Sequence, residues 1–144
     1  MRWVVGQSVL IMAIVVSCIA AVEIHSRTLK SIGLALALCG AVLAVWAAKE
    51  LGRWFTVRPK PRADAKLAAG GPYRFVRHPI YTAGALVCGG VSLGRSWIGL
   101  ALTGALVLLW TGKSRVEERY LTERFPEYPD YRLRVRARFL PYLF

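Results

Sequence analysis

Charged side chains are missing from long stretches of this chain. Residues 3–22 and 31–48 contain none, and residues 79–112 contain only Arg95. A bilayer core of ~30 Å is crossed by roughly 20 helical residues. The first two stretches are therefore each predicted to span a membrane. The overall composition, 56% hydrophobic, excludes an ordinary soluble domain of this length.

The third stretch, residues 79–112, is too long for a single span. Arg95 lies in its middle between Gly94 and Ser96, and this is a turn signal. The pattern predicts two antiparallel helices at about 79–93 and 96–112. We therefore expect an all-α, polytopic membrane protein with about four transmembrane helices, the last two of which form a hairpin.

Acidic residues are scarce, since 8 Asp and Glu stand against 20 Lys and Arg. The basic residues gather in 49–78 and 113–138, on either side of the third apolar stretch. This excludes a recognisable nucleic-acid module. Because cytoplasmic loops carry the excess of Lys and Arg, both segments are predicted to be cytoplasmic. With four spans the N-terminus and the C-terminus then lie in the cytoplasm.

Metal-ligating residues are also few. The chain has 3 cysteines and 2 histidines, and they show neither a Cys-x-x-Cys motif nor a Cys/His ligand spacing. Cys18, Cys39 and Cys88 all lie within apolar segments, where small buried packing residues are expected. The sequence predicts no metal site.

Polar residues are present at one informative place, residues 71–81, just before the third apolar stretch. Proline restricts the residue before it, so His78 is predicted to be extended and Pro79 to open a helix. Residues 73–78 would then form a non-helical strip. The free amide groups at the start of that helix favour an anion, and Arg77 stands beside them. We expect a carboxylate or phosphate of a small cofactor to bind there.

A second polar cluster lies at the far end of the hairpin. Residues 111–125 contain no proline and are predicted to continue the last helix beyond the membrane. Glu117 and Glu118 should then approach Arg77, His78 and Tyr81. One carboxylate could accept hydrogen bonds from ribose hydroxyls while the other pairs with an arginine. Alternatively, both glutamates are surface acids that neutralise nearby basic side chains.

In this order and spacing the residues resemble the isoprenylcysteine carboxyl methyltransferase family, and phospholipid N-methyltransferases are similar in the same region. The likeness covers roughly residues 70–141. The residues that carry it are Gly71, Tyr73, Arg77, His78, Pro79 and Tyr81, then Glu117, Glu118 and Leu121, and then Phe125, Tyr128, Tyr131, Arg138, Phe139 and Pro141.

The resemblance implies an integral membrane methyltransferase that uses S-adenosyl-L-methionine. It implies a cofactor pocket formed by Tyr73, Arg77, His78, Pro79, Tyr81, Glu117 and Glu118. The methyl acceptor would be a lipid or a lipidated molecule, methylated on a carboxylate oxygen or on an amine nitrogen. A carboxylate acceptor would be oriented by an arginine, for which Arg74, Arg136 and Arg138 are candidates. An amine acceptor needs a general base, and Glu117 could serve.

Two other functions remain open, an NADPH-dependent membrane reductase and a non-enzymatic membrane assembly protein. The expected organisation is a single domain over 1–144, with a helical hairpin in 1–55 and a cofactor-binding core in 70–141. The aromatic and basic tail from Tyr128 onward is predicted to be an interfacial segment. The end of the chain carries no eukaryotic retention signal, and we expect a bacterial inner membrane. The oligomeric state is not predicted.

Overall fold

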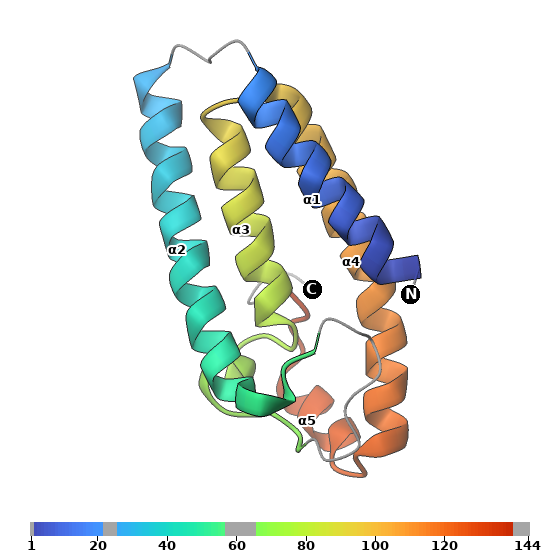
Figure 1. The fold of residues 1–144 in the computed structure, drawn as a ribbon. Helices are drawn as coiled ribbons and strands as arrows, with labels where there is room; N and C mark the ends of the chain where they lie inside the picture. Colours follow the sequence, from blue (N-terminus) through green and yellow to red (C-terminus); the bar gives the residue numbers. More distant parts are fainter. Residues whose placement is uncertain (1, 22–25, 57–65, 140–144) are drawn as a thin grey trace.

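The computed structural model describes residues 2–21, 26–56 and 66–139, and within these ranges the protein is entirely helical (Figure 1). The predicted all-α fold is confirmed for this part of the chain. The five α-helices are α1 (Arg2–Ala20), α2 (Arg27–Leu51), α3 (Pro79–Leu93), α4 (Trp97–Arg124) and α5 (Tyr128–Arg134), and two short 3-10 helices are η1 (Gly52–Trp54) and η2 (Gly71–Arg74).

Three helices are long and apolar enough to cross a membrane, namely α1, α4, and α2 together with η1. The fourth apolar helix, α3, has only 15 residues, which is fewer than the roughly 20 that a straight span needs. Its bounds follow local signals in the sequence. Pro79 stands at the first helical position, where its missing N–H costs nothing, and the helix ends at Leu93, before Gly94.

The long helices pack side by side with α3 in the middle (Figure 1). Helix α2 packs mainly against α3, and α1 packs mainly against α4. The contact between α2 and α3 is close because glycines meet there: a Cβ atom on Gly90 would overlap the carbonyl oxygen of Gly33. Such small residues let helices approach in lipid. The division of the chain into a hairpin at 1–55 and a core at 70–141 stays a prediction, and the two helices of that hairpin pack mainly on α4 and α3.

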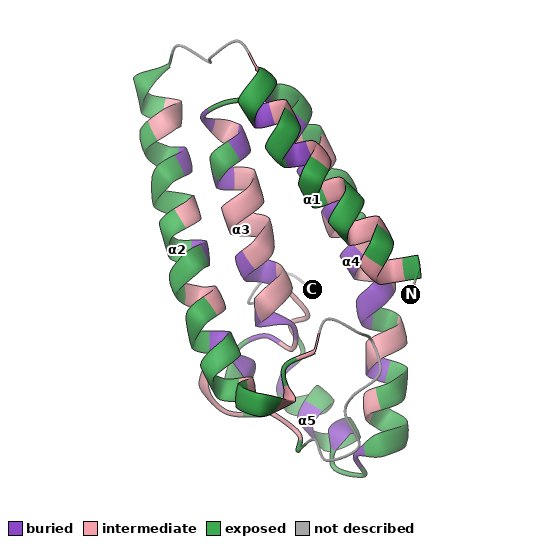
Figure 2. Ribbon diagram, viewed as in Figure 1, coloured by how far each residue is buried: buried purple, intermediate pink, exposed green. Residues whose placement is uncertain are grey.

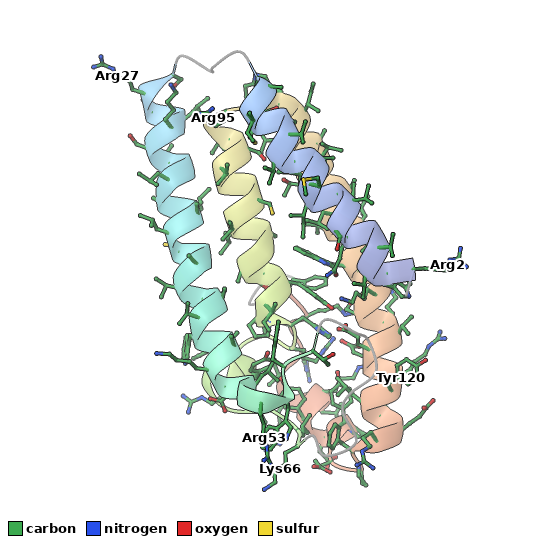
Figure 3. All side chains as sticks on the ribbon, viewed as in Figure 1. Arg2, Arg27, Arg53, Lys66, Arg95 and Tyr120 are labelled. Carbon is green, nitrogen blue, oxygen red and sulfur yellow. The ribbon has the colours of Figure 1, made fainter. Side chains whose placement is uncertain are left out.

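The outward faces of α1 and α2 are exposed along most of their length (Figure 2). These faces carry large apolar side chains, such as Ile19 and Val42, which are 73% and 69% exposed. A surface of this kind is suited to lipid. Of the labelled charged residues, Arg27 and Arg95 lie at one end of the bundle, Arg53 and Lys66 lie at the other, and Arg2 lies at the start of α1 (Figure 3).

At the Arg53 end, helix α4 extends past α3, and the chain then folds back through α5 (Figure 1). The predicted non-helical strip at 73–78 is partly wrong, because η2 forms a 3-10 turn there. Gly71 opens that turn at φ 50°, a backbone conformation that glycine adopts without a Cβ penalty. The tail is also more than an interfacial segment: the backbone N–H groups of Arg77 and His78 donate to the carbonyls of Ala137 and Arg138 at 3.0 Å.

Parts of two predicted features lie outside the described residues. Residues 140–144, which hold the end of the predicted core and of the tail, are not described, and neither are residues 57–65 of the basic segment. The described part of the tail contacts α3, because the hydroxyl of Thr82 donates to the carbonyl of Phe139.

Candidate active site

Glu118 lies at the centre of a buried cluster of charged residues. Its side chain is 6% exposed, and Arg77 Nε donates to its Oε1 at 3.0 Å. Arg138 donates to both carboxylate oxygens at 3.2 Å, and His78 Nε2 lies 3.3 Å from Oε1. Charge-assisted bonds of this type are the strong ones. Glu118 therefore joins α4 to the start of α3 and to the C-terminal segment.

Backbone geometry delivers Arg77 and His78 to this cluster. His78 caps α3 in a non-helical conformation, with φ −127° and ψ 61°, as expected for a residue before proline. Arg77 also donates from Nη1 to the carbonyl oxygens of Val135 and Arg136, each at 2.9 Å. One guanidinium thus holds the tail and the glutamate together. The anion beside the start of α3 is the protein's own Glu118, where we expected part of a cofactor.

Glu117 lies next to this cluster and faces a cavity. The hydroxyl of Tyr81 donates to Glu117 Oε1 at 2.6 Å, and His78 Nδ1 lies 3.6 Å from Oε2. His78 is thus placed between the two glutamates, and in either tautomer one ring nitrogen carries a proton to donate. Lys113, one turn earlier on α4, places its ammonium 3.8 Å from Glu117 Oε1.

An aromatic stack, formed by His78, Tyr81 and Trp110, supports Glu117. The rings of His78 and Tyr81 are stacked with centroids 5.6 Å apart, and those of Tyr81 and Trp110 with centroids 5.2 Å apart. Gly84 makes room for this stack, because a Cβ atom there would clash with the Trp110 ring at 2.5 Å. The stack fixes the direction of the Tyr81 hydroxyl, and it therefore helps to fix the carboxylate that accepts from it.

The cavity in front of Glu117 is mostly apolar and open at its mouth. Its volume is about 220 Å³. Ligand pockets are concave and mostly apolar, with a few placed polar groups. The polar or aromatic side chains that line it are Gln7, Trp54, Phe55, Thr56, Lys66, Tyr73, Arg77, His78, Tyr81, Trp110, Lys113, Glu117, Phe125, Tyr128 and Tyr131.

Three buried tyrosines form part of the cavity wall and differ in their hydrogen bonding. The Tyr131 hydroxyl donates to the Tyr73 carbonyl at 2.7 Å, and burial raises the pKa of Tyr131 to about 12. Burial also raises the pKa of Tyr73 and of Tyr128. The Tyr128 hydroxyl and the Trp54 indole N–H are buried and have no hydrogen-bond partner among the described residues. Buried polar atoms of this kind call for an explanation.

The structure brings most of the predicted site residues together. Tyr73, Arg77, His78, Tyr81 and Glu117 line the cavity. Pro79 and Glu118 are buried and do not line it, and Arg138 binds Glu118.

Arg74 and Arg136 do not reach the cavity. Arg74 is exposed, with its guanidinium 5.9 Å from the centroid of the Phe75 ring. Arg136 is exposed and lines a separate surface groove. The only arginine that lines the cavity is therefore Arg77, among the residues that the structure describes.

Sequence reasoning missed the residues that come from outside residues 70–141. Gln7 of α1 and Trp54 of η1 both line the cavity. Trp54 reads from the sequence only as an interfacial anchor, and Gln7 as one polar residue in an apolar span. Lys113 also lines the cavity and is 1% exposed. Its place as the first charged residue after an apolar stretch, where the helix continues, was the signal that could have pointed to it.

A family of known proteins matches this site and its scaffold. The family model described as phospholipid methyltransferase matches residues 29–128, which contain all but the first two residues of α2, all of α3 and α4, and the first residue of α5. The chain therefore belongs to the phospholipid methyltransferase family. The match includes His78, Tyr81, Glu117 and Glu118. It excludes α1 and the tail segment that contacts Arg77.

Two relatives carry names from metal resistance. The chain is 31% identical over 116 residues to the cobalt-zinc-cadmium resistance protein CzcN of Cupriavidus metallidurans, covering 78% of this chain and 48% of the relative. It is 32% identical over 88 residues to the nickel-cobalt-cadmium resistance protein NccN of Alcaligenes xylosoxydans xylosoxydans, covering 60% of this chain and 41% of the relative. The chain thus spans less than half the length of either relative.

Proposed function

We propose that the protein transfers a methyl group from S-adenosyl-L-methionine to a lipid or lipidated acceptor at the cytoplasmic face of a bacterial inner membrane. Membership of the phospholipid methyltransferase family supports the reaction class. The observation that carries the proposal is the Glu117 carboxylate, held by Tyr81 at 2.6 Å, at the wall of an apolar cavity. A carboxylate and aromatic rings around an apolar space suit a cationic sulfonium and an adenosyl group.

The polar groups of the cavity fit this cofactor in kind. A sulfonium is attracted to the faces of aromatic rings, and the Tyr81 and Trp110 rings are stacked beside Glu117. The buried Trp54 N–H and Tyr128 O–H offer donors without a partner in the described part of the chain. They can bind acceptor atoms of an adenine, a ribose or a carboxylate. Residues that would hold the cofactor are therefore Trp54, Tyr81, Glu117 and Tyr128.

The protein's part in methyl transfer is alignment and exclusion of water. When bound, the cofactor supplies an electrophilic methyl group on a positively charged sulfur. The residues around the cavity would have to align the acceptor with the methyl–sulfur bond of the bound cofactor. Such orientation can supply roughly 7–11 kcal/mol. The stacked rings of His78, Tyr81 and Trp110 would keep water away from one side of the aligned acceptor and methyl group.

The acceptor end of the reaction has two possible arrangements. An amine acceptor loses a proton during methylation, and Glu117 is the carboxylate that lines the cavity and could accept it. A carboxylate acceptor needs only a cation, which Lys113 or Lys66 could provide from the wall. Arg138, predicted for this role, is bound to Glu118. The family name favours a phospholipid amine.

We propose four membrane spans, with α3 as a short one and both termini in the cytoplasm. A helix of 15 residues has a length of roughly 22 Å, less than the ~30 Å hydrocarbon core. If Arg95 marks the outer boundary, His78 lies within the hydrocarbon core, short of the inner boundary, where acyl chains can reach the cavity from the side. Labelling of single cysteines at Arg27 and Arg53 from opposite sides of the membrane would test this orientation.

Binding measurements in lipid nanodiscs would test the proposed function. We expect the protein to bind S-adenosyl-L-methionine and S-adenosylhomocysteine by titration calorimetry, and NADPH not at all. Glu117→Gln should weaken binding by about tenfold, because a charged hydrogen-bond acceptor is lost. Glu123→Gln, an exposed position on the same helix, is the control. Binding of NADPH alone would support the reductase, and binding of no cofactor would contradict methyl transfer.

A second candidate is a non-enzymatic membrane component that takes part in metal resistance. Only the names of the two relatives favour it. The described residues contain no group of three or more His, Cys, Asp and Glu side chains placed to hold a metal ion. A strain in which the native gene is deleted and replaced by the Glu117→Gln variant separates the two candidates. Methyl transfer predicts loss of any metal resistance that the protein provides, and an assembly role predicts that it is retained.

A further inference from the structure

Gln7 is a half-buried polar side chain in a helix that otherwise has few polar groups. It lines the cavity, and its Oε1 accepts hydrogen bonds from Lys113 Nζ at 2.9 Å and from Trp110 Nε1 at 3.4 Å. Polar side chains within membrane helices are costly and usually mark a function. Helix α1 lies outside residues 29–128, which match the family. The contact thus involves a helix that lies outside the matched region.

The helices α1 and α4 come close together at this level. A Cβ atom on Gly112 would meet the Trp3 ring at 2.9 Å, and one on Gly6 would meet Leu109 at 3.0 Å. The two glycines lie next to Lys113 and Gln7 in the sequence. Their small size lets the amide of Gln7 reach across to the lysine.

Lys113 in turn contacts the groups that hold Glu117. Its side chain is 2% exposed, and its Nζ lies 3.8 Å from Glu117 Oε1, the same oxygen that accepts from the Tyr81 hydroxyl. The ammonium also lies 5.2 Å from the centroid of the Tyr81 ring. A buried ammonium is costly unless a counter-charge and hydrogen-bond acceptors surround it. The Gln7 carbonyl is such an acceptor, and it adds no charge that would compete with Glu117.

We propose that Gln7 is a positioning residue of the active site, which holds the Lys113 ammonium against Glu117 and thereby fixes the carboxylate that faces the cavity. The cavity is incomplete without α1, so the N-terminal helix does more than anchor the chain in the membrane. The part of this inference that concerns cofactor affinity rests on the proposed function. The contact between Gln7 and Lys113 can be tested without it.

The first test is a double-mutant cycle on the full chain in lipid nanodiscs, with S-adenosylhomocysteine as the probe. Gln7→Met keeps the length of the side chain, removes the acceptor and is compatible with lipid. We expect it to weaken binding about tenfold, since hydrogen bonds to charged groups are the strong ones. In a Lys113→Met background Gln7→Met should have no further effect, because the interaction between the two side chains is already lost.

The matched control is Ser8→Met, which places the same side chain on an exposed position of the same helix. It should bind as the wild type does. An unchanged affinity in Gln7→Met would overturn the inference. An equal loss in the wild-type and Lys113→Met backgrounds would also overturn it, because Gln7 would then act only through helix packing.

The second test needs no cofactor and separates this inference from the proposed function. Lys113 is acetylated with acetic anhydride in nanodiscs, and its rate is measured by mass spectrometry relative to that of exposed Lys49. We expect slow modification in the wild type and in Ser8→Met, and at least fivefold faster modification in Gln7→Met, as expected when a hydrogen bond to an ammonium is lost. Equal rates in the wild type and Gln7→Met would overturn the inference. If these rates differ as expected while no cofactor binds, only the proposed function fails.

Discussion

Arg77 and Glu118 are 41 positions apart in the sequence, and they form a 3.0 Å ion pair in which both side chains are less than a tenth exposed. Arg77 comes directly before the cap of α3, and Glu118 lies on α4. The same carboxylate binds Arg138 of the tail. This cluster therefore connects three segments at the end of the bundle that we propose to be cytoplasmic.

Removing the glutamate should be strongly destabilising. In Glu118→Ala, two arginines would lose their counter-charge in a buried place, and breaking such a pair costs about 3–5 kcal/mol. We expect the midpoint of thermal unfolding in detergent to fall by several degrees or more. Glu123→Ala, which changes an exposed glutamate of the same helix, should change it little. A stable Glu118→Ala variant would show that the cluster does not join these segments.

Tyr131→Phe tests the contact between α5 and η2. The lost bond is buried, and the Tyr73 carbonyl would be left without that partner, so we expect a loss of about 1–3 kcal/mol. Tyr120→Phe, at an exposed position, is the control and should unfold as the wild type does. Free energies of unfolding in detergent would measure both.

The same tyrosine predicts a dependence on alkaline pH. Its pKa rises from an ordinary value of 10.0 to about 12 in the folded protein, chiefly through burial. A group with a raised folded pKa favours folding below its unfolded pKa, and this contribution is lost as the pH rises through the folded value. Stability should therefore fall between pH 10 and about 12, and the fall should be smaller in Tyr131→Phe. An identical pH profile in the two proteins would contradict this.

The parts of the fold that follow from local signals could be predicted from the sequence. Pro79 fixes the start of α3, and the Gly94–Ser96 turn fixes its end. Because a short turn makes neighbouring helices antiparallel, the sequence alone placed Glu117 and Glu118 near His78. Chain connectivity and the geometry of one helix pair are enough to predict these features.

The remaining parts depend on non-local packing, which leaves no periodic pattern. The backbone bonds between Arg77 and Ala137 involve no particular side chain, so the tail could not be placed from residue types. The approach of α1 to α4 at Gly112 depends on which faces of two apolar helices meet. In an all-apolar helix the sequence does not distinguish these faces. Gln7 and Trp54 were missed for this reason.

Gly90→Ala tests the close contact between α2 and α3. The added methyl group would overlap the Gly33 carbonyl and lie 2.7 Å from the Ala37 nitrogen, and backbone atoms cannot move aside cheaply. We expect a loss of about 1–3 kcal/mol. Gly104→Ala is the matched control, because nothing lies within 4 Å of its added methyl group. It should be neutral or stabilising by up to about 1 kcal/mol, as measured by unfolding in detergent.

Arg74 and Arg138 were both predicted to be catalytic, and their positions predict different results. Arg138→Ala removes two bonds to Glu118 and should weaken S-adenosylhomocysteine binding severalfold, because the carboxylate that contacts both Arg77 and His78 would be held less firmly. Arg74 is exposed and lies outside the cavity, so Arg74→Ala should bind as the wild type does. Calorimetry in nanodiscs measures both affinities. A loss in Arg74→Ala alone would restore that residue as a candidate for the site.

Tyr128→Phe should separate ligand binding from stability. Its hydroxyl is buried at the cavity wall and has no partner among the described residues, so its removal leaves no hydrogen bond broken. The unfolding midpoint without ligand should stay the same or rise, since a buried unsatisfied group is costly. If the hydroxyl binds the cofactor, the affinity for S-adenosylhomocysteine should fall by about fivefold to tenfold, roughly 1–1.4 kcal/mol. Tyr131→Phe should show the opposite order of effects, a large loss of stability and a small loss of affinity. Equal affinities in Tyr128→Phe and the wild type would mean that the unpaired hydroxyl serves no ligand.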